Sequence, residues 1–343
     1  MLVRLFLSLI AMLIAVGSAV ADPYVYTAID DPLAGPGGTT FINGINDTGV
    51  LTGYSVTSGT FHSFVDVGGT FTTIADPLAV GGHTLAQGIN NAGEIAGEYT
   101  VDDLNTNSDF TVHGFVDIGG VYTTIDVPGA VPGTTEVYGI NNAGAIVGDY
   151  ATADAHGFAH EHGFVDIGGT FTTIDDPLGT NATDVFSIND NGVLTGTYFY
   201  INGSSPGTHG FVDNGGVFTT ITDPAMPGLD TLPSGINDAG ALVGQYFDNS
   251  NPNNIPVSFL DVGGVFTTIS DPLADLSLGG TAAIGINNTG TIVGGYFDST
   301  TGHGFVATPQ SPADVPEPNS LMLLLAGLLG LGAVRRTVVH RAT

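Results

Sequence analysis

The chain has 343 residues, a formal net charge of −29 and no cysteine, and only four Lys and Arg residues accompany its 33 acidic residues. These four (Arg4, Arg335, Arg336 and Arg341) lie near the two ends, so residues 22–314 carry 32 carboxylates and no Lys or Arg. This composition excludes nucleic-acid binding, phosphate clamps, Schiff-base chemistry, disulfides and thiol catalysis from that region.

The first 21 residues have the pattern of a secretory signal peptide. Arg4 gives a positive start, residues 5–16 form an apolar core, and Ala19-Val20-Ala21 is a small-residue cleavage site before Asp22. We therefore expect the protein to be exported and residues 1–21 to be removed.

Internal repetition organises the chain between its two ends. The unit contains Gly-Ile-Asn-Asn-Ala-Gly, Ile-Val-Gly-x-Tyr, His-Gly-Phe-Val and Phe-Thr-Thr-Ile, and successive copies lie 44–51 residues apart. Each copy therefore holds four short segments rich in β-branched and aromatic residues, which predict strands. Asn, Asp and Gly fill two of the connections, as tight hairpins require. The Asn of the Ile-Asn pair marks the copies at Asn46, Asn90, Asn141, Asn189, Asn237 and Asn287.

A four-stranded repeat of this length predicts a propeller blade. Residues 24–30 supply a lone fourth strand, and residues 303–307 end the last copy at its third strand, so the two ends together complete a blade. For residues 22–307 we predict an all-β, six-bladed β-propeller of four-stranded antiparallel blades, closed by this pairing as in WD40-type rings. The alternative is a β-solenoid. Residues 308–314 are expected to form a linker.

The repeat resembles the bacterial extracellular repeats named for a His-Ala-Phe motif, the HAF repeats. Here the motif is His-Gly-Phe or His-Ser-Phe, and the fifth copy has Val257 in place of the His. The resemblance covers residues 24–307 and implies an exported repeat protein, but it implies no particular activity.

The longer connections between strands define a possible recognition surface. Antiparallel alternation places the two tight turns of each repeat on one face and the variable connections on the other; these include residues 100–112, 151–161, 199–208 and 247–257. Variable loops on one face of a rigid ring are typical of binding surfaces. Tyr, His and Asp residues recur at the strand ends of this face. They suit sugar recognition, or they recur because the blade recurs.

One of these connections has oxygen ligands at alternate positions, as in a calcium-binding loop: Asp103, Asn105, Asn107 and Asp109. The pattern departs from the EF-hand, because Ser108 replaces the required Gly and Gly114 replaces the bidentate Glu. A solvated polar loop is the alternative reading. Calcium is a possible cofactor, and no cofactor is certain from the sequence.

Two further groups are candidates for metal binding and catalysis. His156, His160 and His162 surround Glu161 at a spacing that suits zinc, although His162 also belongs to the repeat motif. Glu136 and Asp184 occupy the same position in neighbouring repeats, at the start of the strand that lines the channel of a propeller. Two carboxylates that converge there would suit acid–base catalysis of glycoside hydrolysis. The other repeats have Phe41, Leu85, Leu232 and Ala282 at this position.

The C-terminal tail has three parts in a fixed order: Pro316-Glu317-Pro318, an apolar run over residues 321–334, and Arg335-Arg336. This order resembles the PEP-CTERM sorting signal, which implies processing by a membrane enzyme, exosortase. As a helix the fourteen apolar residues would rise about 21 Å, short of the ~30 Å hydrocarbon core. We expect residues 315–343 to form a sorting tail with a short transmembrane segment. An ordinary C-terminal anchor is the alternative.

Together these patterns predict an exported protein at the cell surface or in the extracellular matrix of a Gram-negative-type bacterium. The expected role is non-catalytic binding of exopolysaccharide or another surface partner, after an exosortase-like enzyme has processed the tail. Two alternatives stay open. One is a carbohydrate-active hydrolase or lyase that uses carboxylates, and the other is a purely structural, acidic matrix scaffold.

Overall fold

The computed structural model describes residues 23–102, 110–157, 159–202, 205–226, 229–247 and 256–310. One compact unit comprises Tyr26–Thr308 and holds nearly all of the described chain. It is built of antiparallel sheets, and the only helical segment in the described ranges is a single 3₁₀ turn, η1 (Pro32–Ala34). The fold is an all-β propeller, as the repeat pattern predicted.

Four of the sheets are separate four-stranded blades. The first blade along the chain contains β2 (Thr39–Ile45), β3 (Leu51–Thr57), β4 (Thr60–Val67) and β5 (Thr70–Ile74). The next contains β6 (Thr84–Ile89), β7 (Ile95–Asp102), β8 (Phe110–Ile118) and β9 (Val121–Ile125). Another contains β18 (Asp230–Ile236), β19 (Leu242–Phe247), β20 (Val257–Val262) and β21 (Val265–Ile269). The last combines β22 (Thr281–Ile286), β23 (Ile292–Phe297) and β24 (Gly302–Pro309) with β1 (Tyr24–Ile29), which lies beside β24.

The fifth sheet has eight strands. Its first half contains β10 (Glu136–Ile140), β11 (Ile146–Ala153), β12 (Ala159–Ile167) and β13 (Thr170–Ile174). Its second half contains β14 (Ala182–Ile188), β15 (Leu194–Asn202), β16 (Ser205–Asp213) and β17 (Phe218–Ile221). A single parallel pair, Glu161 with Ala182, joins the two halves.

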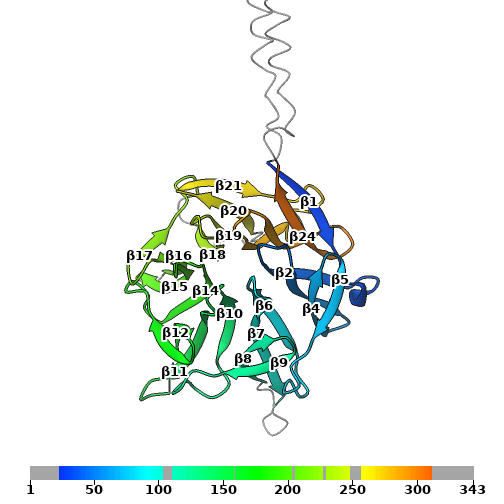
Figure 1. The fold of residues 1–343 in the computed structure, drawn as a ribbon. Coiled ribbons are helices and arrows are strands. Elements are labelled where there is room, and N and C mark those ends of the chain that lie inside the picture. Colours follow the sequence, from blue (N-terminus) through cyan, green and yellow to red (C-terminus); the bar gives the residue numbers. More distant parts are fainter. Residues whose placement is uncertain are drawn as a thin grey trace, which may run out of the picture. The chain divides into compact units, whose positions relative to one another are not determined.

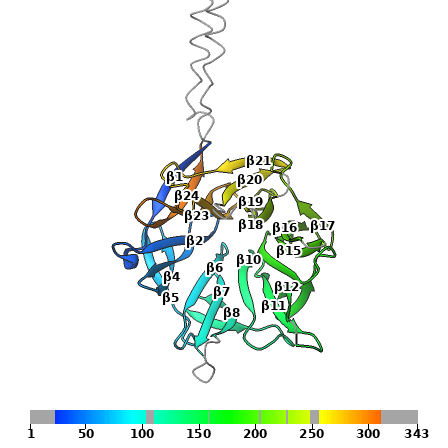
Figure 2. The same ribbon diagram turned by 180° about the vertical axis from the view of Figure 1, so that it is seen from behind.

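The sheets surround a central axis, with β2, β6, β10, β14 and β18 nearest to it and β5, β9, β17 and β21 at the periphery (Figure 1). Figure 2 shows the same arrangement from behind. The core lies between neighbouring sheets and is built by the Phe of the His-Gly-Phe element, which is 1% exposed or less in every repeat. Burying six such rings is a large apolar contribution to stability. These residues are Phe64, Phe115, Phe164, Phe211, Phe259 and Phe305.

Glycine sets the close spacing of the first two strands in several repeats. A Cβ atom added at Gly148 on β11 would overlap the carbonyl oxygen of Glu136 on β10. The Gly of the Gly-x-Tyr element is therefore required by contact with the innermost strand. This contact fixes the position of the residue that begins that strand.

Candidate functional site

Six asparagines, one from each repeat, close the central axis at one end. We call these asparagines, together with the residue that follows each of them, the axial plug. The side-chain Nδ2 of each asparagine donates to the backbone oxygen of the asparagine in the next repeat, at 3.0–3.2 Å, and Asn287 returns to Asn46. Each Oδ1 accepts from backbone N–H groups of its own turn, as Asn46 does from Thr48 and Val50. One side chain thus forms the hairpin and joins it to its neighbour. The asparagines are Asn46, Asn90, Asn141, Asn189, Asn237 and Asn287.

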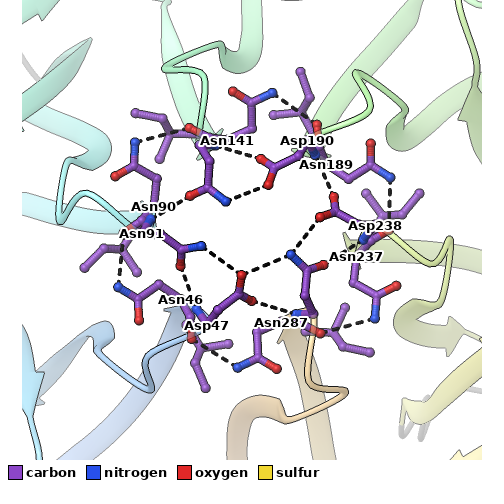
Figure 3. A pocket seen from close by; sticks show the side chains of 18 residues that line it. Asn46, Asp47, Asn90, Asn91, Asn141, Asn189, Asp190, Asn237, Asp238 and Asn287 are labelled. Carbon is purple, nitrogen blue, oxygen red and sulfur yellow. Dashed lines mark hydrogen bonds between the residues drawn. The ribbon is translucent and has the colours of Figure 1, made fainter.

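The residues that follow these asparagines form a second closed ring (Figure 3). The backbone N–H of each donates to the side-chain Oδ1 of its counterpart in the next repeat, at 2.7–2.9 Å. Asn side chains also donate to the neighbouring carboxylates. Burial acts to raise the pKa of Asp47, but hydrogen bonds from Asn91 and Asn288 outweigh it and lower that pKa. The ring encloses about 80 Å³; its members are Asp47, Asn91, Asn142, Asp190, Asp238 and Asn288.

Side chains of neighbouring innermost strands contact one another at the middle of the channel. Asn43 Nδ2 donates to Gln87 Oε1 at 2.9 Å, and the rings of Tyr138 and Phe186 meet edge to face at 5.3 Å. The space between this level and the axial plug is about 120 Å³. Ligand pockets usually measure roughly 300–1,000 Å³. The middle of the channel is therefore too small to hold an ordinary ligand.

The opposite end of the channel carries a cluster of carboxyl groups. Glu136 begins β10, and Asp149 lies directly opposite it on β11. Glu98 lies on β7, which packs against β10, and Asp184 lies on β14, which packs against both β10 and β11. All four residues are part-buried. We call this end the axial mouth. It comprises Glu98, Asp149 and the six residues that occupy the Glu136 position of the repeat, within the first three residues of each innermost strand: Phe41, Leu85, Glu136, Asp184, Leu232 and Ala282.

Burial and mutual repulsion raise the pKa of three of these carboxyl groups. Burial, reinforced by the charge of Glu136, raises the pKa of Glu98 to about 8. Burial and the charges of Glu161 and Glu136 raise the pKa of Asp184 to about 6. Burial and the charges of Asp184 and Glu136 raise the pKa of Asp149 well above its usual value. In a domain without Lys or Arg, protonation is the available way to relieve this repulsion.

Tyr138 extends the cluster toward the middle of the channel. Its hydroxyl donates to Glu136 Oε2 at 2.5 Å, so this carboxylate accepts a hydrogen bond inside the cluster. Among the described residues, Glu98 Oε2 is buried and has no hydrogen-bond partner. The mouth therefore offers both donors, from protonated carboxyl groups, and acceptors, from ionised ones.

The structure brings the two predicted catalytic candidates, Glu136 and Asp184, into this one cluster. Sequence reasoning missed Glu98, Asp149 and Tyr138. A signal for two of them was present, because Glu98 and Asp149 each precede the Tyr of the Gly-x-Tyr element, where the other repeats have Tyr54, Thr197, Gln245 and Gly295.

The three predicted zinc ligands do not converge. His162 uses Nδ1 for Asp175 and Nε2 for Thr152, and His156 lies beside Asp154 in a turn. In the described ranges, no group of three or more His, Asp or Glu side chains is arranged to hold a metal ion. The candidate calcium ligands Asp103, Asn105, Asn107 and Asp109 lie outside the described residues, as do Pro316, Glu317, Pro318, Arg335 and Arg336 of the tail.

The recurring histidines of the face that carries the variable connections pack within their own blades. His113, His162 and His303 each pair with an Asp at 2.8 Å. Each imidazole also packs on a Tyr ring of the neighbouring strand, with centroids 5.1–5.5 Å apart. These contacts account for the repetition of His and Tyr by packing within the blade. The Asp partners are Asp126, Asp175 and Asp30.

Comparison with known proteins characterises the tail. Residues 314–336 match the PEP-CTERM protein-sorting motif, which indicates an exported protein that is held at a membrane before processing by exosortase. The match covers less than a tenth of the chain, so it characterises the tail and not the propeller. In the part of the chain that the structure describes, no helix is long and apolar enough to cross a membrane. The predicted membrane segment at 321–334 lies outside that part.

No curated protein matches this chain. A gluconolactonase from Xanthomonas campestris is similar in structure, with 13% identity, a TM-score of 0.44, and coverage of 85% of this chain and 97% of the gluconolactonase. The Trypanosoma rangeli sialidase has 11% identity and a TM-score of 0.43, covering 79% of this chain and 54% of the sialidase. Both TM-scores are below 0.5, so neither likeness bears on the function of this chain.

Proposed function

We propose that the protein is a non-catalytic, glycan-binding propeller of the cell surface or extracellular matrix, and that the axial mouth is its binding site. The observation that carries this proposal is the convergence of four carboxyl groups, Glu98, Glu136, Asp149 and Asp184, at one end of the channel, where burial raises the pKa of Glu98, Asp149 and Asp184. Protonated carboxyl groups donate to hydroxyls and ionised ones accept from them, so the cluster can satisfy a polyol in several orientations.

The rest of the mouth suits the apolar side of a sugar ring. Phe41, Leu85 and Leu232 occupy the positions equivalent to Glu136 in other repeats, and all three are part-buried. Sugars have polar edges and an apolar C–H face that packs on aromatic and aliphatic side chains. The domain has no cation that could offset a polyanion, so a neutral exopolysaccharide is the preferred partner.

We also propose that the ring has six blades. The eight-stranded sheet counts as two blades, because only the Glu161–Ala182 pair joins its halves. The cyclic hydrogen bonds of six asparagines and the position of β1 beside β24 support this count and the closure of the ring by the two ends of the chain.

The sorting motif in the tail also suggests how the protein is processed and where it is located. We propose that residues 1–21 are removed on export, that the tail anchors the protein transiently in the membrane, and that an exosortase-like enzyme recognises Pro316-Glu317-Pro318. The producing cell would then be of the Gram-negative type. The HAF-type repeats, residues 24–307, would be the part of the protein that is exposed outside the cell. Mass spectrometry of the protein recovered outside the cells tests this, because replacing the three residues by alanine should leave the tail attached.

A carbohydrate-active hydrolase or lyase is the second candidate. The observation that favours it is the separation of pKa values within one cluster, with Asp184 at about 6 and Glu98 at about 8. Such separation is how paired carboxyl groups divide acid and base roles. Release of reducing ends that is abolished by Glu136→Gln or Asp184→Asn would select the enzyme.

Binding of the full-length protein to neutral polysaccharide from the producing cells tests the main proposal. Saturable retention without turnover is expected, and Glu136→Gln should weaken it about tenfold, the effect of losing a hydrogen bond to a charged group. Glu94→Gln is the matched control, since Glu94 accepts from Asn90 of the axial plug, away from the carboxyl cluster, and the Gln side-chain oxygen can accept the same bond. The binding measurement is repeated with calcium and with EDTA, which tests whether the candidate calcium ligands at 103–109 contribute to binding. Absence of retention in every arm would favour the structural scaffold instead.

A further inference from the structure

The face that carries the axial plug also carries a second set of turns. In the first blade, Leu51 at the start of β3 pairs with Ile45 at the end of β2 and with Asp66 near the end of β4. The turn between β4 and β5 therefore lies at the same end of the sheet as the plug turn. The other blades repeat this register, and we call these turns the rim hairpins: residues 66–70, 117–121, 166–170, 213–217 and 261–265.

Every rim hairpin exposes a large apolar side chain. These side chains are β-branched, and between 56% and 67% of each residue is exposed to solvent. Two of the hairpins expose two such residues each, one on either side of the Gly-Gly pair. The apolar tips thus recur around the periphery of the propeller, where the outermost strands β5, β9, β17 and β21 lie (Figure 1). The residues are Val67, Ile118, Val121, Ile167, Val217, Val262 and Val265.

The rim hairpins expose no charge, although each contains one carboxylate. Asp66 Oδ1 accepts from the backbone N–H of Gly69 at 2.7 Å, and the equivalent Asp of the other four hairpins makes the same bond at 2.6–2.8 Å. Each of these Asp residues is buried. On the opposite face, by contrast, Asp30, Asp126 and Asp175 have half-exposed carboxylates. An uncharged, apolar border is therefore a distinct property of the plug face in this acidic domain.

The chain leaves the propeller from the same face. β24 is the third strand of the last repeat, and Ala307 near its end pairs with Ile292 at the start of β23, so β24 runs toward the rim. The eleven residues 310–320 separate the end of β24 from the apolar run of the sorting tail. Fully extended, they span at most about 40 Å. A bilayer that holds the tail is therefore tethered within that distance of the end of β24, at a high effective concentration.

We propose that the rim hairpins dock on the surface of a neutral lipid bilayer while the tail anchors the protein. Apolar side chains without exposed charge enter the boundary between headgroups and acyl chains, and the tether makes a weak contact sufficient. A second copy suits the rim less well, because two rims face to face would bring together two axial plugs, each with Asp47, Asp190 and Asp238. The proposal is independent of the carboxyl cluster and rests on membrane anchoring by the tail. In this orientation the axial mouth faces away from the membrane.

Single-cysteine labelling tests the docking, because the natural chain has no Cys. In the full-length protein, Thr170→Cys places an environment-sensitive fluorophore on a rim hairpin, and Ala225→Cys places it on the opposite face; both positions are exposed. Each labelled protein is floated with phosphatidylcholine vesicles that contain brominated lipid. The bromine atoms should quench the label in Thr170→Cys and leave the label in Ala225→Cys unquenched.

Matched substitutions identify the side chains responsible. Ile118→Ser combined with Val121→Ser should reduce the quenching of the label in Thr170→Cys. Leu178→Ser, at a similarly exposed position of the opposite face, should leave that quenching unchanged. Phosphatidylglycerol in the vesicles should weaken the docking, and added salt should restore it, because the protein is strongly acidic.

Four results would overturn the proposal. Three of them are floated protein in which both labels are quenched equally, floated protein in which neither label is quenched, and absence of flotation. The fourth is a change in the emission of Thr170→Cys that needs no vesicles and grows with protein concentration, which would assign the rim to a second copy of the chain. None of these results bears on glycan binding, which is measured separately.

Discussion

Asn287 donates from its side-chain Nδ2 to the backbone oxygen of Asn46 at 3.0 Å, across 241 positions of sequence. The same bond links each repeat to the next one along the chain, where the partners are 44–51 positions apart. Five of these hydrogen bonds join residues about one repeat apart in the sequence, and the sixth joins the last repeat to the first. The six bonds therefore form a closed cycle. The axial plug therefore acts on the stability of the whole ring.

Asn287→Asp should lower the free energy of unfolding by about 1–3 kcal/mol, the cost of a buried group left without its partner. The substitution keeps the Oδ1 atom that accepts from Thr289 and Thr291, and it places an oxygen against the carbonyl of Asn46. Urea unfolding measures the change. Asn214→Asp, at an exposed turn, adds the same charge without touching the plug. Equal stability of the two variants would contradict the role of the plug.

Stability should fall as the pH rises from about 5 to 9. Glu98 and Asp184 have native pKa values of about 8 and about 6, raised from 4.5 and 3.8 by burial and by neighbouring carboxylates. The native state therefore binds more protons than the unfolded chain in this range. The corresponding stabilisation is complete below the unfolded pKa values and is lost as the pH passes the native ones. One pKa unit corresponds to about 1.4 kcal/mol, so a loss of a few kcal/mol is expected.

Glu98→Gln isolates the part of this effect that Glu98 carries. The amide resembles the protonated acid, so the variant should match the natural protein below about pH 4 and exceed its stability by a growing margin as the pH rises to 8. Thermal unfolding followed from pH 3.5 to 9 tests both limits. Glu94→Gln supplies the comparison for loss of a carboxylate outside the cluster. If stability depends on pH in Glu98→Gln as strongly as in the natural protein, another group causes the pH dependence.

Added salt should raise the melting temperature. The 32 carboxylates of residues 22–314 have no Lys or Arg partners, so their mutual repulsion opposes folding and is relieved by screening. We expect a rise of several degrees between very low and physiological ionic strength, and a further rise with divalent cations. Calorimetry in sodium chloride and in magnesium chloride of equal ionic strength separates screening from cation binding. A melting temperature independent of salt would contradict this expectation.

The repeat pattern was sufficient to predict the propeller, because the strands and turns follow from local sequence. The repeat pattern does not predict the axial plug. It predicts Asn46 as a turn residue, which is correct, but the bond from its side chain to Asn90 also joins two sheets. Such a bond depends on how neighbouring sheets are placed around the axis, and no single copy of the repeat contains that information.

In the candidate site, too, some residues could be predicted from the sequence and others could not. Glu136 and Asp184 were found because they interrupt an apolar position at the start of the innermost strand. Glu98 and Asp149 lie on the second strand and reach the same space only because β7 and β11 pack against the neighbouring innermost strands. Their charges shift one another's pKa values, an effect of proximity that spacing in the sequence could not supply.

The close contact of Gly148 with Glu136 provides a test of how the site is positioned. A Cβ at Gly148 would overlap the carbonyl oxygen of Glu136, so Gly148→Ala should push β10 away from β11 and displace both Glu136 and Asp149. Gly294 has the same contact with the carbonyl of Ala282, in a sheet that contributes no carboxyl group to the mouth. Gly294→Ala should therefore cost similar stability, on the order of 1–3 kcal/mol for an overpacked site. Only Gly148→Ala should also weaken glycan binding and reduce the dependence of stability on pH. If both variants lose binding equally, the position of the carboxyl cluster does not determine affinity.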